Sequence, residues 1–475
     1  MKLKLISVFV AAATLNIMGC SMAPRHERPA APVADAYPAM PAVAGMAAPS
    51  TPQGKAAYDT GWRDYFTDPR LQQLIASALE HNRDLRTAAL RVEEARALYD
   101  VQSADRLPNV NANVSESRAR TPAAFSATGK AAVGQRADAG VAIPAFELDF
   151  FGRVKSLSDA ALASYLATDE ARLAAQLTVV AETAKAYYTE RALAEQAALA
   201  QRTYDARAKT YGLTQQRVEA GASSRLDLRS NETLMETARV AALTLARQRA
   251  QAANALAVLV GEPVMGNESG TMLSDAAIDA MSALPEGLPS DLLARRPDIR
   301  ASEQRLQAAN ANIGAARAAF FPRISLTAAL GSASPTFGGL FDGGSGTWSF
   351  TPQLVLPVFA AGRNQANLSL AETRKHIAVA DYEKTIQTAF REVADALAAR
   401  SYLGGQVTAQ RAIQEAQAER LKLLTLRFEN GVASSLDVLD AQRELFSAEQ
   451  SLVQARLLRA TSAIDLYKAL GGGIK

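Results

Sequence analysis

Histidine and cysteine are almost absent from the 475-residue chain, which has three histidines and one cysteine. This inventory cannot build a Cys/His zinc site, a disulfide framework or a Cys-His nucleophile pair, and no acidic loop of the calcium-binding type occurs. No histidine stands in the context of a Ser-His-Asp triad. The sequence therefore predicts no catalytic residue, no metal and no cofactor, and we expect that the protein is not an enzyme.

The chain also lacks an excess of charge of either sign. Its formal net charge is +3, and lysine and arginine are interspersed with acidic residues instead of forming blocks. Proteins that bind nucleic acid carry clustered basic residues. We therefore expect no nucleic-acid partner.

The N-terminus has the features of a secretory signal. Lys2 and Lys4 precede an apolar run, 5–18, that is too short to span a bilayer comfortably. The run ends in Ile-Met-Gly-Cys at 17–20, which resembles a bacterial lipobox, so that 1–19 would be removed and Cys20 would carry the lipid. Ser21 after the cysteine then implies sorting to the outer membrane. The alternative is an ordinary signal peptide with a chance cysteine.

The segment 20–60 is rich in alanine and proline and has few large apolar residues. Such a composition cannot form a core, so it predicts an extended tether after the acylated cysteine. Aromatic residues return at 61–66, where the folded part is expected to begin.

An internal duplication organises the rest of the chain. The segment Arg217–Leu228 recurs as Arg427–Val438, and Gly152-Arg153 recurs as Gly362-Arg363, both at an offset of 210. These matches define a first repeat, 61–262, an inter-repeat equatorial linker, 263–288, and a second repeat, 289–475.

Each repeat has the same predicted order of elements. An amphipathic helix, 84–107 or 297–320, ends before a proline, and period-two alternation follows it. Four strands are predicted in all, at about 109–119, 136–148, 322–332 and 347–357.

Proline is then missing from 145–262 and from 358–475, which are rich in alanine, leucine, glutamate, glutamine and arginine. The run 153–211 alone would form a helix about 90 Å long, a length typical of elongated assemblies. We expect Gly212 and Gly404-Gly405 to interrupt these helices as bends.

The helices are predicted to turn back at Gly221 and Gly431, because glycine accepts the left-handed conformation that ends a helix. Ser224 with Asp227, and Ser434 with Asp437, have capping-box spacing and would begin the returning helices.

Four strands per chain cannot close a barrel, and open edges are costly in a bilayer. Two chains would give eight strands, enough only for a side-chain-filled interior, whereas three chains would give twelve and leave a lumen. Aromatic residues at or near strand ends suit the membrane interfaces; these are Phe320, Phe321, Trp348 and Phe350. The alternative is a soluble β-hairpin packed on a coiled coil.

Two motifs carry a resemblance to a known family. The segments 62–71, WRDYFTDPRL, and 288–299, LPSDLLARRPDI, are similar to those of outer-membrane efflux factors. These are TolC-like proteins, and the resemblance is to the acylated branch that serves resistance–nodulation–division (RND) drug pumps. It implies a homotrimer with a twelve-stranded β-barrel continued by a twelve-helix α-barrel. It also implies a periplasmic adaptor (membrane-fusion) protein, an inner-membrane RND pump and passive conduction of drugs or other small molecules to the exterior.

The resemblance also implies where function resides. Leu436 and Asp440, one turn apart near the start of the last helix, would form the periplasmic gate. The alternative for Asp440 is a solvated residue paired with Arg443. The first repeat has Ser230 at the equivalent position, so a carboxylate ring would have threefold symmetry.

The adaptor would dock on the hairpin ends, at Arg217, Gly221, Arg427 and Gly431, although these glycines could be plain helix stops. Two further alternatives stay open: a type I protein-secretion outlet, and a periplasmic coiled-coil lipoprotein scaffold without a pore.

Overall fold

The computed structural model describes residues 21–38, 55–264, 275–285, 287 and 289–472. Cys20 lies outside these residues. The described part forms two compact units, which interleave along the sequence. Of the described residues, one contains those within 21–30, 91–169 and 301–382, and the other contains those within 31–90, 170–300 and 383–472.

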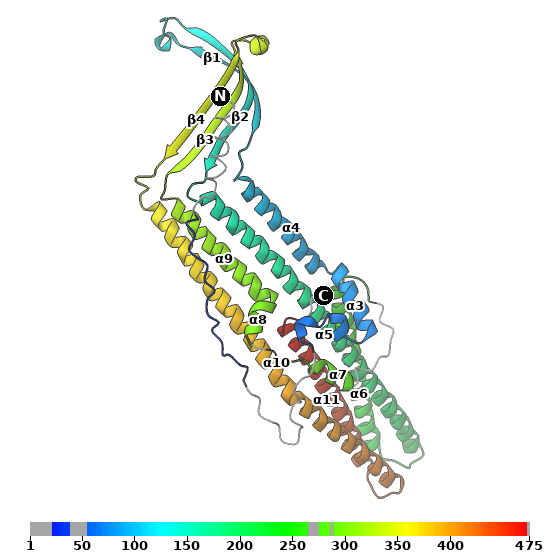
Figure 1. Ribbon diagram of the computed structural model, residues 1–475. Coiled ribbons are helices and arrows are strands. Elements are labelled where there is room, and N and C mark those ends of the chain that lie inside the picture. Colours follow the sequence, from blue (N-terminus) through cyan, green and yellow to red (C-terminus); the bar gives the residue numbers. More distant parts are fainter. Residues whose placement is uncertain (1–20, 39–54, 265–274, 286, 288, 473–475) are drawn as a thin grey trace. The chain divides into compact units, whose positions relative to one another are not determined.

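The first unit contains a four-stranded antiparallel sheet in the order β1-β2-β3-β4 (Figure 1). Its strands are β1 (Asn111–Thr121), β2 (Ala132–Leu148), β3 (Arg323–Ser334) and β4 (Gly346–Val355), and short 3-10 turns, η2 (Ala123–Phe125) and η3 (Phe337–Phe341), lie in the connections. β2 begins four residues before the predicted strand, since its extra residues pair with β1 up to Thr121. The sheet leaves β1 and β4 as edges without a partner strand within the described chain.

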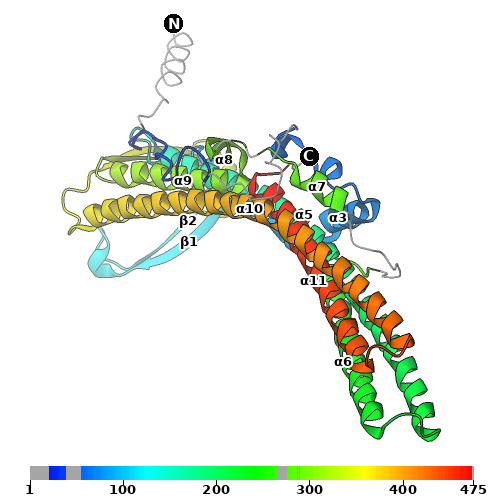
Figure 2. The same cartoon turned by 90° about the horizontal axis from the view of Figure 1, so that it is seen from below.

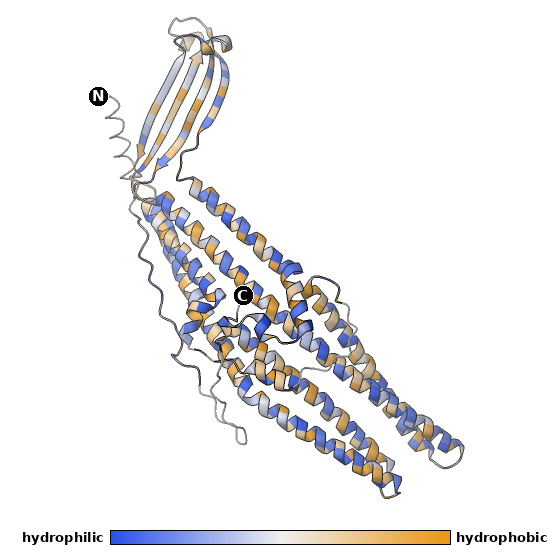
Figure 3. Cartoon of the chain, turned by 45° about the vertical axis from the view of Figure 1, so that its right-hand side comes forward, coloured by the Kyte–Doolittle hydropathy of each residue, from blue (hydrophilic) through white to orange (hydrophobic). Residues whose placement is uncertain are grey.

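The register gives the sheet one apolar and one polar face. Trp348 pairs with Leu330 and Phe350 with Ala328 on one face, whereas Thr351 pairs with Thr327 on the other. Figure 3 shows the resulting alternation of hydropathy along the strands. Trp348 is 78% exposed in the single chain, so the apolar face has no cover within it.

Pro144 explains why the alternation in β2 is irregular. The pairing of β2 with β3 shifts register between Ile143 and Phe146. Proline has no N–H to give to a ladder, so it is placed at a bulge. The Pro144 carbonyl instead accepts a hydrogen bond from the Thr327 hydroxyl at 2.9 Å.

Two helices of 67 residues follow the sheet segments: α5 (Arg153–Glu219) and α10 (Arg363–Glu429). At 1.5 Å per residue each is about 100 Å long. Both remain helical through Gly212 and Gly404-Gly405, so these glycines do not end the helices, and a bend at them stays a prediction. A helical glycine costs only about 1 kcal/mol relative to alanine, which the surrounding helix can offset.

Each long helix is followed by a returning one, α6 (Arg225–Val260) or α11 (Ser435–Ala469). Figures 1 and 2 both show α10 beside α11. The remaining helices are η1 (Ala57–Asp59), α2 (Trp62–Tyr65), α3 (Pro69–His81), α4 (Arg83–Ala104), α7 (Asp275–Ser282), α8 (Pro289–Arg295) and α9 (Pro297–Ala318). Among the described helices, none combines the length and apolar character needed to cross a membrane.

The first recognised motif packs the second unit. Tyr65 stacks on Tyr467 of α11, with ring centroids 4.1 Å apart, and Phe66 meets both rings edge-on. The Tyr65 hydroxyl donates toward the carbonyls of Met281 and Ala463, at 3.0 and 2.8 Å. Burial raises the pKa of Tyr65, so it stays a neutral hydrogen-bond donor.

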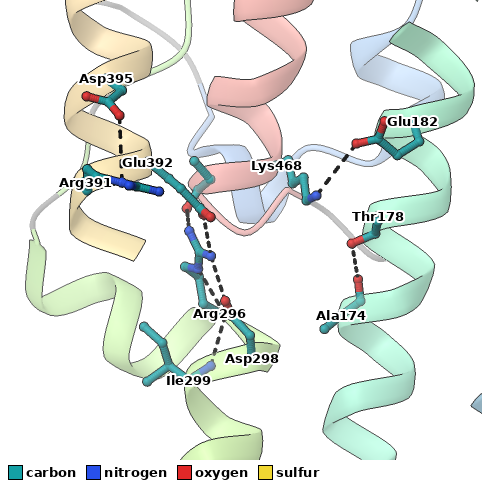
Figure 4. Close-up of polar contacts among 11 residues, drawn as sticks. Ala174, Thr178, Glu182, Arg296, Asp298, Ile299, Arg391, Glu392, Asp395 and Lys468 are labelled. Atoms are coloured by element: carbon teal, nitrogen blue, oxygen red, sulfur yellow. Dashed lines mark hydrogen bonds and ion pairs between the residues drawn. The ribbon is translucent and has the colours of Figure 1, made fainter. Parts of the chain in front are cut away.

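The second recognised motif supplies a buried arginine (Figure 4). The Arg296 guanidinium pairs with Asp298 and with Glu392 of α10, each at 2.7 Å. It also donates to the Ala469 carbonyl at the end of α11, at 3.0 Å. Arg296 therefore connects the start of α9 to both long helices of the second hairpin.

Candidate functional site: the ends of the helical hairpins

The two hairpins end in the same backbone motif. Gly221 and Gly431 have φ of +71° and +73°. The Ala222 N–H donates to the Arg217 carbonyl at 2.7 Å, and the Val432 N–H donates to the Arg427 carbonyl at 2.8 Å. These are six-to-one Schellman bonds, which satisfy carbonyls at a helix end. The interpretation of both glycines as helix stops is confirmed.

Capping boxes begin the returning helices, as the spacing predicted. The Asp437 N–H donates to the Ser434 hydroxyl at 3.2 Å, and the Ser434 N–H donates to the Asp437 carboxylate at 3.0 Å. Ser224 and Asp227 repeat the arrangement. Hydrogen bonds from Ser434 lower the pKa of Asp437, and those from Ser224 lower the pKa of Asp227. These two aspartates are explained as helix caps.

Leu436 and Asp440 have different surroundings. Leu436 is 71% exposed and contributes nothing to the core of its own chain. Asp440 Oδ1 lies 2.6 Å from Arg443 Nη2, and its other oxygen lies 3.6 Å from Arg420 Nη2 of α10. Asp440 therefore pairs with Arg443, as the alternative interpretation held, and Arg420 adds a second cation that the sequence reasoning missed.

The first hairpin differs from the second at the positions equivalent to Asp440 and its neighbours. Ser230 supplies no carboxylate, but Arg207 of α5 is only 6% exposed. Its guanidinium donates to the Leu234 carbonyl at 3.0 Å. Burial lowers the pKa of Arg207, and the positive charge of Arg443 lowers it further. A comparison of the two repeats could have singled out Arg207, because the equivalent position in the second repeat, at the offset of 210, is the neutral Gln417.

An open groove lies at the end of the second hairpin. Its volume is about 810 Å³, and leucines of α10 form much of its wall. Arg427 lines it, together with Leu423, Leu426, Asn430, Val432 and Asp437. Of the four residues predicted to dock an adaptor, Arg427 lies in this groove. Gly221 and Gly431 lie at open turns, where an added Cβ would meet no atom within 4 Å.

Metal chemistry has no support in this part of the chain. Within the described ranges, no group of three or more His, Cys, Asp or Glu side chains is arranged to hold a metal ion.

Comparisons with known proteins agree with this architecture. A sequence model of the family described as "Outer membrane efflux protein" matches residues 74–262 and again 288–472. The chain is 47% identical to the probable efflux pump outer membrane protein TtgC of Pseudomonas putida, over 99% of this chain and 95% of the relative. It is 46% identical to the outer membrane protein OprJ of Pseudomonas aeruginosa, over 98% and 95%.

Solved structures share the fold. The open state of the Neisseria gonorrhoeae MtrE outer membrane channel superposes with a TM-score of 0.84 at 42% identity, over 96% of this chain and 99% of that one. A membrane protein from Pseudomonas aeruginosa gives a TM-score of 0.86 at 45% identity, over 96% and 98%.

The predicted mainly helical fold with two strands per repeat, and the predicted duplication, are thereby confirmed. The chain belongs to the outer membrane efflux protein family, the TolC-like family that its motifs resemble, whose members are outer-membrane channels and not enzymes.

Proposed function

We propose that this protein is the lipid-anchored outer-membrane channel of a tripartite efflux system. It passively conducts drugs or other small molecules from an inner-membrane RND pump and a periplasmic adaptor to the cell exterior. The observation that carries this proposal is the sheet, which has two unpaired edges and one apolar and one polar face. Relatives named as antibiotic and toluene efflux proteins support the class of compound.

A homotrimer follows from the edges of the sheet. In a bilayer the unpaired N–H and C=O groups of β1 and β4 would each cost several kcal/mol. Pairing β4 of one copy with β1 of the next removes them. Three copies of a four-stranded sheet give a twelve-stranded barrel with a lumen.

The polar face of the sheet would then line the lumen. Its uncharged members include Ser325, Thr327, Thr351 and Gln353, which pair across β3 and β4. The same face also carries Glu147, opposite Ser325, and Arg323, which form an ion pair at 3.4 Å. Hydroxyl and amide groups together with paired charges offer hydrogen bonds to many solutes without selecting one charge. Choice of substrate is therefore assigned to the pump.

The periplasmic gate is assigned to Leu436 and Asp440. Both lie on one face of α11, four residues apart, and Leu436 has no core role within its chain. Three leucines brought together would exclude water. Three Asp440–Arg443 pairs would reduce the repulsion that bare carboxylates suffer at close range.

Adaptor docking is assigned to Arg217, Gly221, Arg427 and Gly431. The helix-stop role of the glycines is compatible with contact, because the turns are open. The groove beside Arg427 supplies apolar surface next to charges of both signs, from Glu419, Arg420, Arg427 and Asp437, which suits a partner segment with apolar residues flanked by polar ones.

Cys20 is assigned as the site of acylation. At least two acyl chains give firm anchoring, whereas one gives marginal binding. Cys20→Ser should abolish palmitate incorporation, and normal labelling of that variant would contradict the anchor.

Two measurements on the detergent-solubilised protein test the channel itself. We expect a particle with about three times the 50.4 kDa mass of the chain, and discrete conductance in planar bilayers when Leu436 and Asp440 are replaced by alanine. A monomer, or a trimer that never conducts, would favour the coiled-coil scaffold.

A further inference from the structure

The segment that follows Cys20 lies against α9. Residues 21–30 and most of α9 belong to the same compact unit, and the segment contains no helix or strand. In Figure 1 it runs alongside α9. We call residues 21–30 the strap.

Three contacts attach the strap to α9. Arg28 makes a two-pronged pair with Glu303, with both N···O distances 2.8 Å, and Glu303 is only 8% exposed. The buried Asn310 side chain donates to the Pro24 carbonyl at 2.7 Å. At Gly314 an added Cβ would lie 2.7 Å from the Ala23 backbone nitrogen and 2.6 Å from Ser156 Oγ of α5, so glycine permits close approach both of the strap and of α5.

The three α9 residues form one stripe. Their spacing of seven and then four residues returns to the same face of a helix with 3.6 residues per turn. A buried carboxylate without a cation is costly, and Arg28 is the cation that meets Glu303 at hydrogen-bonding distance. The stripe thus has three features that match the strap. Glu303 supplies a charge for Arg28, Asn310 supplies a hydrogen-bond donor for the Pro24 carbonyl, and Gly314 leaves space for Ala23.

The strap and α9 run antiparallel in matching register. Ala23 to Arg28 is five residues, or about 17 Å when extended. Gly314 back to Glu303 is eleven helical residues, or about 16 Å. Because the two lengths are equal, the strap is extended along the stripe. Its N-terminal end points along α9 toward β3.

We propose that the stripe Glu303, Asn310 and Gly314 is a docking site for the chain's own N-terminal segment, and that it sets the level at which the lipid enters the membrane. The second part rests on the proposed acylation of Cys20. Ala23 is three residues after Cys20, a span of at most about 11 Å. At 1.5 Å per residue that distance corresponds to about seven residues along the direction of α9 from Gly314, which passes the end of α9 at Ala318 and reaches the level of Phe320 and Phe321, just before β3 begins at Arg323.

This level suits a lipid anchor. Phe320 and Phe321 are each 40% exposed, and aromatic residues mark the interface of an outer-membrane sheet. A strap of fixed length would place the acyl chains where the sheet enters the bilayer, so that lipid and strands insert at one depth.

Charge reversal in the full-length protein tests the docking. In Arg28→Glu or Glu303→Arg, thermolysin should remove the strap about tenfold faster than in wild type, as followed by intact mass, because cleavage tracks the open population. The double variant should regain a rate close to wild type. Arg25→Glu is the matched control, because Arg25 is exposed and has the same charge change three residues away. Its rate should equal that of wild type.

Equal cleavage in wild type and both single variants, or no recovery in the double variant, would overturn the docking site. Gly314→Ala should also accelerate cleavage, whereas Gly212→Ala, at a helical glycine in open space, should not. The assay works equally in a Cys20→Ser background, so docking is judged separately from acylation.

The level of the lipid is tested by changing the length of the strap. Inserting two residues after Ser21 should slow insertion of the sheet into lipid vesicles, followed as the gain of resistance to alkaline extraction, whereas the same insertion after Ala31, beyond Arg28, should leave the rate unchanged. Equal insertion rates of the two variants would overturn the second part of the proposal.

Discussion

Replacing Asp440 by alanine removes the carboxylate that Arg443 contacts at 2.6 Å. Each Arg443 would keep Glu444, 3.2 Å away, as its only carboxylate neighbour in the described part of the chain, so in the proposed trimer the positive charge at the aperture is less fully compensated, and like charges at close range favour separation of the helices. We therefore expect Asp440→Ala to shift the channel toward its open state.

The size of this shift follows from exposure. The side chains of Asp440 and Arg443 are 41% and 62% exposed, so each pair contributes about 0.2–1 kcal/mol after solvent screening. Three pairs sum to about 0.6–3 kcal/mol, which is about a 3-fold to 150-fold change in the ratio of open to closed channels. Leu436→Ala should act in the same direction by removing the apolar seal.

Single-channel recording in planar bilayers measures this ratio directly. The matched control is Ser230→Ala, at the equivalent position of the first repeat, which should leave the open probability unchanged. In the double variant Asp440→Ala/Arg443→Ala, the arginine that loses a carboxylate in the single variant is also removed, so leak should fall below that of Asp440→Ala. Identical open probabilities in wild type, Asp440→Ala and Leu436→Ala would refute the gate.

Three further predictions concern the hairpins and the packing beneath them. The pKa of Asp437 is lowered in the folded chain, so its cap is complete above the pKa of the unfolded state and is lost as pH falls through the folded value; the protection of amides at the start of α11, measured as the exchange rate relative to the intrinsic rate at the same pH, should fall on acidification, and Ser434→Ala should remove this pH dependence. Gly431→Ala should cost about 1–2 kcal/mol, because alanine is strained at positive φ; Gly212→Ala, within a regular helix, should instead be neutral or stabilising in the same thermal melt. Tyr65→Phe leaves the carbonyls of Met281 and Ala463 without their hydroxyl donor and should destabilise the protein by about 1–3 kcal/mol in denaturant titration; an unchanged midpoint would contradict the role of that hydroxyl.

Helix ends, helix starts and strands could be predicted from the sequence wherever one short segment determines the local backbone conformation. Gly431 with Ser434 and Asp437 encodes a helix end and a helix start within seven residues, and the structure has both. The strand alternation in β3 and β4 was equally direct. The start of β2 was predicted four residues late because its length depends on pairing with β1, and its bulge at Pro144 depends on β3, which lies in the other repeat.

Contacts between distant segments were not readable. Arg28 and Glu303 are separated by 275 positions, and no spacing rule links them. Arg296 lay within a recognised motif, yet its partner Glu392 is 96 positions away. At Gly404 and Gly405 the low helix propensity of glycine predicted an interruption, but the surrounding α10 remains helical.

The duplication separates what the hairpin ends need for folding from what the second one adds. Both repeats keep the Schellman turn and the capping box, since any helix that reverses there must satisfy its terminal N–H and C=O groups. They differ one turn further along, where Asp440, Arg443 and Arg420 correspond to the neutral Ser230, Thr233 and Thr210. The first hairpin has an ion pair within α6, between Arg229 and Glu232, which serves the stability of that helix, whereas the network of the second hairpin joins α11 to Arg420 of α10. Its presence in one hairpin of each chain is what a threefold gate requires, because six equivalent carboxylates at one aperture would double the charge to be compensated.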